Sequence, residues 1–360
     1  MEPLKEMFNK TFYSRLADEF AEVHKNFNPH KFILDVTRGL SDRSLNERMR
    51  NTSLVLKNHL PNDYKKAVEI LQTVIPQMPG GYTNLLFPDF VGLYGHDHVD
   101  HSMEALKFFT RFGSSEFAVR EFLKRDFRKA IGYMNQWAKD KNYHVRRLAS
   151  EGSRPRLPWS FKLEEVIKNP TATFAILEQL KQDPELYVRK SVANHLNDIS
   201  KDNPNHMLTL VNSWDKSHAH TSWIIKHASR SLIKKGHSGS LAVFDFEKNV
   251  KVNIENFVLK NTKLKLGDTL QFDFDVVSKK KTSQKLVIDY LIHYRKKHGE
   301  LSPKVFKLTE LTLLPAQRTH LSKKQKMKDF TTRKHFAGVH ELEIQVNGRI
   351  LDKRQFHLSV

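Results

Sequence analysis

Residues 145–149 read VRRLA, residues 188–193 read VRKSVA and residues 225–229 read IKHAS, so a similar string recurs after 43 and then 37 residues. A weaker copy, VREFL, occupies residues 119–123. A helix pair of about 40 residues that repeats in this way is typical of HEAT-like repeats, which stack into an α-α superhelix. The repeat therefore predicts an all-helical N-terminal part.

The pattern of apolar residues changes near residue 240. Up to Lys235, apolar residues recur at helical spacings of three and four. Beyond a stretch with two glycines at 234–240, alternating runs rich in Val, Ile, Phe and Tyr predict about seven strands, as in LQFDFDV at 270–276. Turn signals lie at Gly267-Asp268, His298-Gly299 and Asn347-Gly348. This pattern favours an immunoglobulin-like β-sandwich.

The predicted domain organisation follows from these two patterns. We expect a HEAT-like helical domain at 1–236, a linker at 237–241 and a basic immunoglobulin-like β-sandwich at 242–360. The fold class is thus a multidomain protein, α then β.

Composition narrows the class of function. The 360 residues contain 60 Lys and Arg against 40 Asp and Glu, a net charge of +20, which favours a polyanionic partner. The absence of cysteine excludes disulfides, thiolate zinc sites and thiol nucleophiles. Any chemistry must therefore use carboxylates, histidine, lysine or hydroxyl groups.

The sequence shows no apolar window long enough to span a membrane, and its start lacks the apolar core of a signal peptide. We therefore expect a cytoplasmic, nucleoid-associated protein with no membrane partner.

Positive charge is concentrated in the predicted β domain. Residues 241–360 hold 24 Lys and Arg against 13 Asp and Glu, more than half of the excess. The densest stretch is 321–328, which includes Lys323 and Lys324, and further clusters lie at 279–281 and 295–297. We expect these lysines to contact a polyanion, with solvated turn lysines as the alternative.

The repeat also places cations at regular positions. Arg120, Arg146, Arg189 and Lys226 fall near the start of successive helices that line the concave face, where a row of cations suits a phosphate backbone. The alternative is that a repeat arginine only pairs with a neighbouring aspartate.

The string HDHVDH at 96–101 matches the HxHxDH motif of metallo-β-lactamase-like hydrolases. We reject a metal site there because the string precedes a predicted helix instead of ending a strand in a mostly β scaffold. Asp100 or Ser102 is expected to be the N-cap of that helix.

The stretch at 144–159, HVRRLASEGSRPRLPW, holds four arginines and ends in Trp159. Pro155 and Pro158 fix backbone angles there, so the loop is expected to hold Trp159 in place. Glu151 falls in the last turn of a helix before Gly152, the expected cap, where the helix dipole disfavours a carboxylate. The alternative for Glu151 is a structural acid paired with arginine.

Together with residues 115–120 and 192–202, this stretch resembles the AlkC branch of the HEAT-like alkylpurine DNA glycosylases. Members of that branch often carry a C-terminal immunoglobulin-like domain, so the resemblance covers both expected domains. It implies a monomeric enzyme of base excision repair that removes 3-methyladenine and 3-methylcytosine from double-stranded DNA without a metal or cofactor.

The resemblance also implies roles for individual residues. Glu116, Glu151 and Asp198 would be acids facing the lesion nucleotide, with Trp159 packed on it. Arg154 would lie beside these acids, and Arg147, Arg156 and Arg189 would hold phosphates. We also expect Arg154 and Lys190 to bind DNA. The chain departs from the family in the loop before the second repeat, which has the histidine-rich string where an acid-rich version is expected.

These residue types suit the implied chemistry. N3-alkylation makes the base cationic and a good leaving group, so the barrier lies in the sugar, which gains oxocarbenium character as the bond stretches. A carboxylate beside it stabilises that charge, and another can orient water. An indole face against the cation adds about 0.5–2 kcal/mol.

Two other classes of function compete with this one. The first is a non-catalytic HEAT-repeat DNA-binding protein, which would have no use for three acids on a phosphate-facing surface. The second is a protein-interaction scaffold, which the net charge and the arginine-rich loop disfavour.

Overall fold

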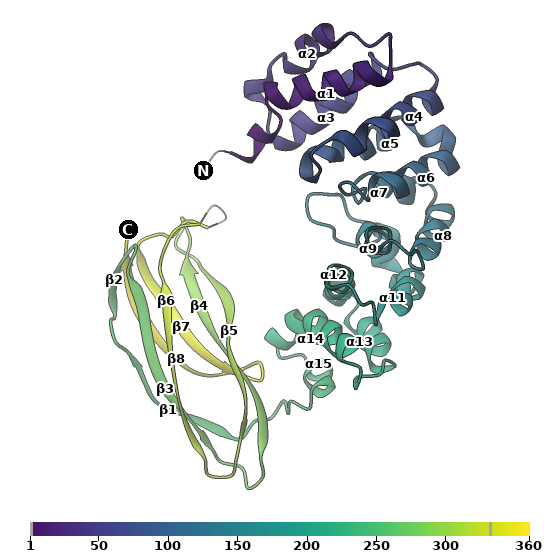
Figure 1. The fold of residues 1–360 in the computed structure, drawn as a ribbon. Helices are drawn as coiled ribbons and strands as arrows, with labels where there is room; N and C mark the ends of the chain where they lie inside the picture. The colour runs from purple at the N-terminus through teal and green to yellow at the C-terminus, as the bar shows by residue number, and fades with distance from the viewer. Residues whose placement is uncertain (1–2, 331–332) are drawn as a thin grey trace. The chain divides into compact units, whose positions relative to one another are not determined.

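A computed structural model describes residues 3–330 and 333–360. The chain divides into two compact units, residues 1–228 and 229–360. The first unit is helical and the second consists mainly of strands (Figure 1). The predicted order of an α region followed by a β domain is confirmed.

The helical unit contains fourteen α-helices within the described residues, the last of which continues into the second unit. Their bounds are α1 Lys10–Val23, α2 Pro29–Thr37, α3 Leu45–Lys57, α4 Tyr64–Val74, α5 Leu86–Tyr94, α6 Val99–Phe109, α7 Ala118–Arg125, α8 Phe127–Trp137, α9 Tyr143–Gly152, α10 Glu164–Lys168, α11 Phe174–Leu180, α12 Leu186–Asp202, α13 Pro204–Asn212 and α14 Ala219–Lys234. Short 3-10 helices are η1 Leu4–Met7, η2 Leu40–Asp42, η3 Ile75–Gln77, η4 Gly81–Leu85, η5 His96–His98 and η6 Pro170–Thr173.

The helices stack along an arc in two rows (Figure 1). In one row α3 contacts α5, α5 contacts α7, and α9 contacts α12, while α4, α6, α8 and α11 follow one another in the second row. Side-chain caps start the middle helices: Asp126 accepts from the Lys129 amide at α8, and Asn142 accepts from the His144 amide at α9. The repeated strings fall on α7, α9, α12 and α14, as the periodicity predicts.

The second unit is a two-sheet sandwich of eight strands within the described residues. The strands are β1 Val252–Leu259, β2 Lys263–Lys265, β3 Thr269–Ser278, β4 Gln284–Arg295, β5 Leu301–Leu313, β6 Arg318–Lys326, β7 Gly338–Val346 and β8 Arg349–Ser359. One sheet has the order β1-β3-β6 and the other β2-β8-β7-β4-β5, antiparallel except where β2 pairs with β8.

The core of the sandwich comes from alternating residues such as Phe272, Phe274, Ile288 and Ile344, all fully buried. The predicted turns separate strands where expected. At the β7–β8 hairpin, Asn347 and Gly348 both have positive φ, of 46° and 79°, as a tight two-residue hairpin turn requires.

The boundary between the parts differs from the prediction. The second unit begins at residue 229, inside α14, and residues of the predicted linker at 237–241 join the helix α15 Ser238–Val243. Leu241 of this helix is fully buried against Ile233 and Val287. The stretch is therefore packed structure, because its apolar residues find a partner on β4 that the local sequence does not reveal.

No helix in the described part of the chain is long and apolar enough to cross a membrane.

Candidate active site

Five residues from α7, α9 and α12 and the turns beside them form a chain of alternating charges. We call Glu116, Arg147, Glu151, Arg154 and Asp198 the acid–arginine cluster. Glu116 precedes α7, Arg147 and Glu151 lie on successive turns of α9, Arg154 follows α9, and Asp198 lies on α12. Because α9 packs on α12, residues 44 positions apart meet here.

The two arginines connect the three acids. Arg147 pairs with Glu116 through Nη1, and its Nη2 lies 3.4 Å from Glu151 Oε1. Arg154 donates from Nη1 to Glu151 Oε1 at 2.6 Å and from Nε to Asp198 Oδ2 at 2.8 Å. Charged hydrogen bonds of this kind are the strong ones in proteins, so they fix the side chains in place.

The second carboxylate oxygens of Glu151 and Asp198 also have partners. Ser191 donates to Glu151 Oε2 at 2.6 Å, and Lys201 donates to Asp198 Oδ1 at 2.8 Å. The side chains of Glu151 and Asp198 are only 7% and 2% exposed, whereas that of Lys201 is 44% exposed. The bond from Lys201 to Asp198 therefore lies at the protein surface, whereas the bond from Ser191 to Glu151 is buried.

The acids change the electrostatics of the arginines. Burial alone would lower the pKa of Arg154, but Glu151 and Asp198 outweigh it and raise that pKa above its ordinary value. At Arg147, Glu151 and Glu116 likewise outweigh burial and raise the pKa. Both guanidinium groups stay charged, so three carboxyl groups share two fixed cations.

Part of the cluster faces a cavity of about 610 Å³. Glu116, Arg147 and Glu151 line it, whereas Arg154 and Asp198 lie behind them and are not among its lining residues. Aromatic side chains supply the other walls: Tyr82, Phe117, Trp159 and Tyr187. We call this space the acid-side cavity; flat apolar walls with a few charged groups are typical of ligand pockets.

Trp159 stands at this cavity in an unusual backbone conformation. Its φ is 64°, a left-handed value that is rare for a bulky residue and that clusters at functional sites. The side chain is 72% exposed and meets the Tyr82 ring edge-on with centroids 6.5 Å apart. An exposed indole at a strained position fits a contact with a ligand better than a core role.

Arg120 on α7 anchors the loop that carries Trp159. Its Nη1 donates to the carbonyls of Gly152 and Arg154 at 3.1 and 2.6 Å, and its Nη2 donates to the carbonyl of Phe161. Three backbone bonds from one guanidinium hold both ends of the 153–161 loop.

Comparisons with known proteins found matches in both the helical part and the β domain. A family model described as "DNA alkylation repair enzyme" matches residues 109–232, and one described as "Uncharacterised protein YhaZ, C-terminal Ig-like domain" matches residues 253–360. The "Uncharacterized protein YhaZ" of Bacillus subtilis (strain 168) is 40% identical over 360 residues, 99% of this chain and 100% of that protein. The chain belongs to the DNA alkylation repair enzyme family.

A solved structure places it more closely within the family. The Pseudomonas fluorescens alkylpurine DNA glycosylase AlkC, bound to DNA containing an abasic site analog, is 42% identical, with 100% of both chains covered and a TM-score of 0.96. The resemblance to the AlkC branch is thereby confirmed, and the β domain is immunoglobulin-like. The acid–arginine cluster lies entirely inside the region that the alkylation repair model matches.

In this member of the alkylation repair family, Arg120 has a structural role. It is fully buried, and burial lowers its pKa to about 10. Its guanidinium donates to backbone carbonyls, and its contact with a phosphate stays a prediction.

Arg146 has the kind of contact that the alternative stated for the repeat describes, and its contact with DNA stays a prediction. It forms two bonds to Asp183, with Nε at 2.6 Å from Oδ2, and its Nη1 donates to the carbonyls of Asp140 and Lys141. Its side chain is 15% exposed. The arginine therefore closes the turn before its own helix and pairs with a neighbouring repeat.

Arg189 repeats the same backbone pattern one repeat later. Its Nη1 donates to the carbonyls six and five residues before it, those of Asp183 and Pro184, at 2.8 and 2.6 Å. Arg189 is half-buried and lies over the Trp223 ring. These bonds give Arg189 a structural role in the turn before α12. Its contact with DNA stays a prediction.

The other predicted DNA-binding residues of the helical unit lie nearer the surface. Lys190 and Lys226 are exposed, and Arg156 pairs with Asp202 at 2.5 Å with 30% of its side chain exposed. The placement of Arg154 is different, because it lies buried inside the cluster. For all four, contact with DNA stays a prediction.

The structure also corrects two predicted helix caps. α6 begins at Val99, so Asp100 lies inside it and pairs with Lys129, and neither Asp100 nor Ser102 is its N-cap. Gly152 is the last residue of α9 and not its cap. A β-carbon there would lie 2.6 Å from Val119 Cγ1, so close helix packing explains the glycine.

The histidine-rich string forms packing contacts. His98 stacks on Tyr64 with ring centroids 5.2 Å apart, and His96 packs against Phe122. Within the described residues, no group of three or more His, Asp or Glu side chains is arranged to hold a metal ion.

Tyr82, Phe117 and Tyr187 are cavity residues that the sequence did not single out. Tyr82 lies on η4 and Tyr187 in the first turn of α12, more than 100 residues apart, so only the stacked repeats bring them together. Phe117 adjoins Glu116 in the sequence, which is the one local signal that could have identified it.

Proposed function

We propose that this protein is a DNA glycosylase of base excision repair that hydrolyses the N-glycosidic bond of cationic N3-alkylated bases, 3-methyladenine and 3-methylcytosine, in double-stranded DNA. The observation that carries the proposal is the pair of carboxyl groups, Glu116 and Glu151, at an aromatic cavity beside the exposed Trp159. The full-length similarity to an alkylpurine DNA glycosylase bound to DNA supports it.

Catalysis of this reaction depends mainly on stabilising the sugar in the transition state, because the alkylated base leaves readily. An N3-alkylated base leaves as a neutral molecule when the C1′–N bond breaks with its electron pair on nitrogen, so a general acid is not required. The deoxyribose becomes positively charged, and fixed carboxylates stabilise that charge. Water then adds to C1′ and loses a proton, for which a carboxylate can act as base.

The three acids have different positions and, in the proposed reaction, different roles. Glu116 and Glu151 line the cavity, which supports a role for them beside the sugar and the attacking water. Asp198 lies behind Arg154, so it acts as a positioning residue that holds Arg154 against Glu151, and its charge reaches the sugar only at longer range. Trp159 packs on the lesion nucleotide and favours a cationic base through its ring face.

Selectivity for charged bases follows from the same arrangement. A neutral adenine or cytosine would need a proton to leave. The arginines that border the acids stay charged and are poor proton donors. The site therefore accelerates only the departure of a base that already carries the charge.

A second candidate function is a non-catalytic HEAT-repeat DNA-binding protein. It is favoured by the full pairing of Glu116, Glu151 and Asp198 with arginines, an arrangement that a purely structural network would share. Duplex DNA treated with dimethyl sulfate separates the two functions: an enzyme releases free methylated base, and a binding protein retains the DNA without release.

The decisive experiment is single-turnover excision from a methylated duplex. We expect Glu151→Gln to slow the release of 3-methyladenine by about 10²–10³-fold, the usual effect of removing one fixed electrostatic group. Asp198→Asn should slow it as well, with thermal unfolding measured alongside because Asp198 is buried. Glu104→Gln, at an exposed acid of α6, is the matched control. Wild-type rates in both site variants would refute the assignment.

A further inference from the structure

Trp159, which is proposed to pack on the lesion nucleotide, needs a neighbour that fixes its side chain. Its indole is 72% exposed, and the bonds from Arg120 hold only the backbone of the 153–161 loop. Among the described residues, the aromatic ring that meets this indole is that of Tyr82, with centroids 6.5 Å apart and ring planes at 76°. Tyr82 is therefore the residue placed to set the orientation of the indole.

Tyr82 and Trp159 are shared by two cavities. Both residues line the acid-side cavity, and both line a second cavity of about 730 Å³ that is formed mainly by α3, α5, α7 and residues 159–161. Two rings at 76° meet edge to face, so their contact covers at most one face of the indole. The other face of this exposed side chain stays open to a ligand.

Tyr82 itself is held by a well-packed turn. Gly80 and Gly81, which precede it, have φ values of 83° and 79°, in the left-handed region that favours glycine. The next residues of η4, 83–85, are buried, and Asn84 Nδ2 donates to the carbonyl of Phe112 at 3.2 Å. The backbone of Tyr82 is therefore fixed by the core of the helical unit, whereas Trp159 stands on an exposed loop.

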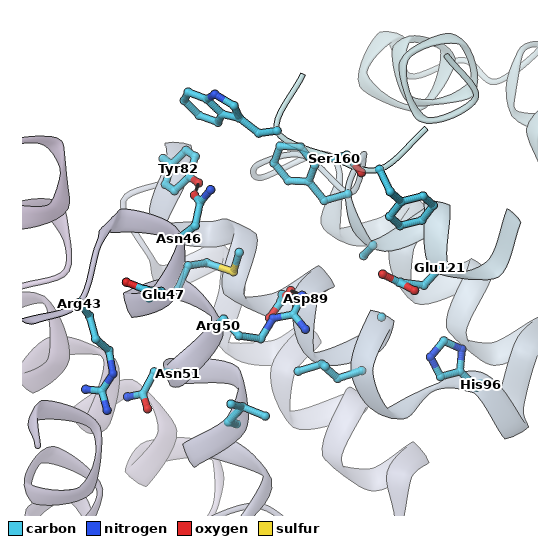
Figure 2. Close-up of a pocket in the computed structure, with 18 of the residues that line it drawn as sticks. Arg43, Asn46, Glu47, Arg50, Asn51, Tyr82, Asp89, His96, Glu121 and Ser160 are labelled. Atoms are coloured by element: carbon cyan, nitrogen blue, oxygen red, sulfur yellow. Dashed lines mark hydrogen bonds and ion pairs between the residues drawn. The ribbon is translucent and has the colours of Figure 1, made fainter. Parts of the chain in front are cut away.

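The far end of the Tyr82 ring is held as well. Its hydroxyl donates to Asn46 Oδ1 on α3. Burial raises the pKa of Tyr82, and the negative charges of Asp89 and Glu116 raise it further, so the hydroxyl stays protonated and remains a donor. Figure 2 shows Tyr82 next to Asn46, on the opposite side of the second cavity from His96. The ring is thus fixed at its backbone and at its hydroxyl.

We propose that Tyr82 is a positioning residue of the glycosylase reaction: it holds the Trp159 indole in the orientation in which the open face packs on the lesion nucleotide. The inference rests on the proposed glycosylase function. An edge-to-face pair favours one arrangement of its rings by about twofold to tenfold. An indole that is already oriented loses less freedom when the lesion arrives, so more of its contact energy is available in the transition state.

Time-resolved fluorescence anisotropy of the full-length protein tests the contact without requiring catalysis. The emission of Trp159 is obtained by subtracting that of the same protein with Trp159→Phe. We expect Tyr82→Leu to roughly double the amplitude of fast indole motion, and Tyr82→Phe, which keeps the ring, to stay close to wild type. Tyr133→Leu is the matched control, because this tyrosine also bonds through its hydroxyl, to Asp100, and meets a tryptophan, Trp137, but lines neither cavity.

Single-turnover excision at saturating protein tests the consequence for the reaction. We expect Tyr82→Leu to slow the release of 3-methyladenine by about fivefold to tenfold, and Tyr82→Phe by less than about threefold. Affinity for the methylated duplex should change by less than about twofold, because phosphate contacts dominate it. In a Trp159→Ala background, Tyr82→Leu should cause no further slowing, since Tyr82 acts through the indole. Tyr133→Leu should leave the rate unchanged.

Three outcomes would overturn the inference while leaving the proposed function intact: unchanged indole motion in Tyr82→Leu, the same slowing by Tyr82→Leu with and without Trp159, or a loss that appears only in affinity for DNA. Equal slowing by Tyr82→Phe and Tyr82→Leu would also overturn it, because the ring would then not be what matters. Absence of excision by the wild-type enzyme would instead refute the proposed function, and the anisotropy would still test the contact. Thermal unfolding of each variant shows that it is folded.

Discussion

The buried cations of the helical unit differ from the lysines on β6 of the second unit. Arg120, Arg146 and Arg154 each make several hydrogen bonds to carbonyls or carboxylates and are mostly buried. Lys324 and Lys326 on β6 are exposed. Both groups add equally to the net charge of +20, yet only exposed cations are free to release counterions from DNA. Burial, more than charge, should therefore decide what each cation does.

The largest effect is expected from Arg120→Met. The change removes the donor from the carbonyls of Gly152 and Arg154, whose bonds to Arg120 are buried, and from that of Phe161, whose bond is partly buried. Each lost bond costs about 1–3 kcal/mol. Allowing for relaxation, we expect a loss of about 3–5 kcal/mol in the free energy of unfolding, measured by denaturant titration. Lys190→Met, at an exposed residue of α12, should change the free energy of unfolding by less than about 0.5 kcal/mol. Equal effects would contradict the comparison.

Arg146→Ala is expected to cause the second largest loss in the free energy of unfolding. It leaves Asp183, whose side chain is 3% exposed, as an unpaired buried acid, which typically costs about 3 kcal/mol. The double variant Arg146→Ala with Asp183→Asn should recover part of that loss, because the stranded charge is gone. If the double variant were less stable than the single one, the ion pair would not be what stabilises this turn.

For the repeat arginines Arg146 and Arg189, the sequence predicted the position on the helix but not the contacts of the side chain. The spacing of 43 and 37 residues correctly predicted stacked helices and placed Arg146 and Arg189 at helix starts. It could not predict that both side chains turn back to the carbonyls six and five residues earlier, because that depends on the backbone of the preceding turn. Position on a helix was predictable, but the direction of the side chain was not.

For the candidate site too, the sequence identified residues but not their arrangement in space. The resemblance to the AlkC branch singled out Glu116, Glu151 and Asp198, and the structure joins all three through two arginines. It did not reveal that Asp198 lies behind Arg154, away from the acid-side cavity. That placement depends on contacts between helices far apart in the sequence.

Asp289 tests whether burial matters in the β unit as well. This acid of β4 is 1% exposed, and burial raises its pKa to about 6 despite Lys234 and Lys307. Between pH 4 and 6 the folded state binds more protons than the unfolded state, whose aspartate pKa is about 3.9, so stability falls as pH rises. We expect Asp289→Asn to stabilise the protein by about 2 kcal/mol at pH 7 and to have little effect below pH 4, as measured by unfolding at both pH values.

The smallest expected effect is on the affinity for DNA and concerns the exposed lysines of β6. It should distinguish Lys324 from its neighbour Lys323. Residues alternate between the two faces of a strand, so Lys324 and Lys326 lie on the exposed face of β6 while Lys323 is half-buried on the other. If β6 contacts DNA, the double variant Lys324→Ala with Lys326→Ala should lower the salt dependence of duplex binding by about 1.8 in log–log slope, with affinity about threefold to tenfold weaker.

Lys323→Ala should leave that slope almost unchanged, and neither variant should alter the free energy of unfolding by more than about 0.5 kcal/mol. A larger slope change for Lys323 would mean that the inward face of β6 contacts DNA and that exposure in the free protein does not identify the binding cations. No change for either variant would assign the salt dependence to the helical unit, whose exposed Lys190 and Lys226 would then be the next pair to substitute.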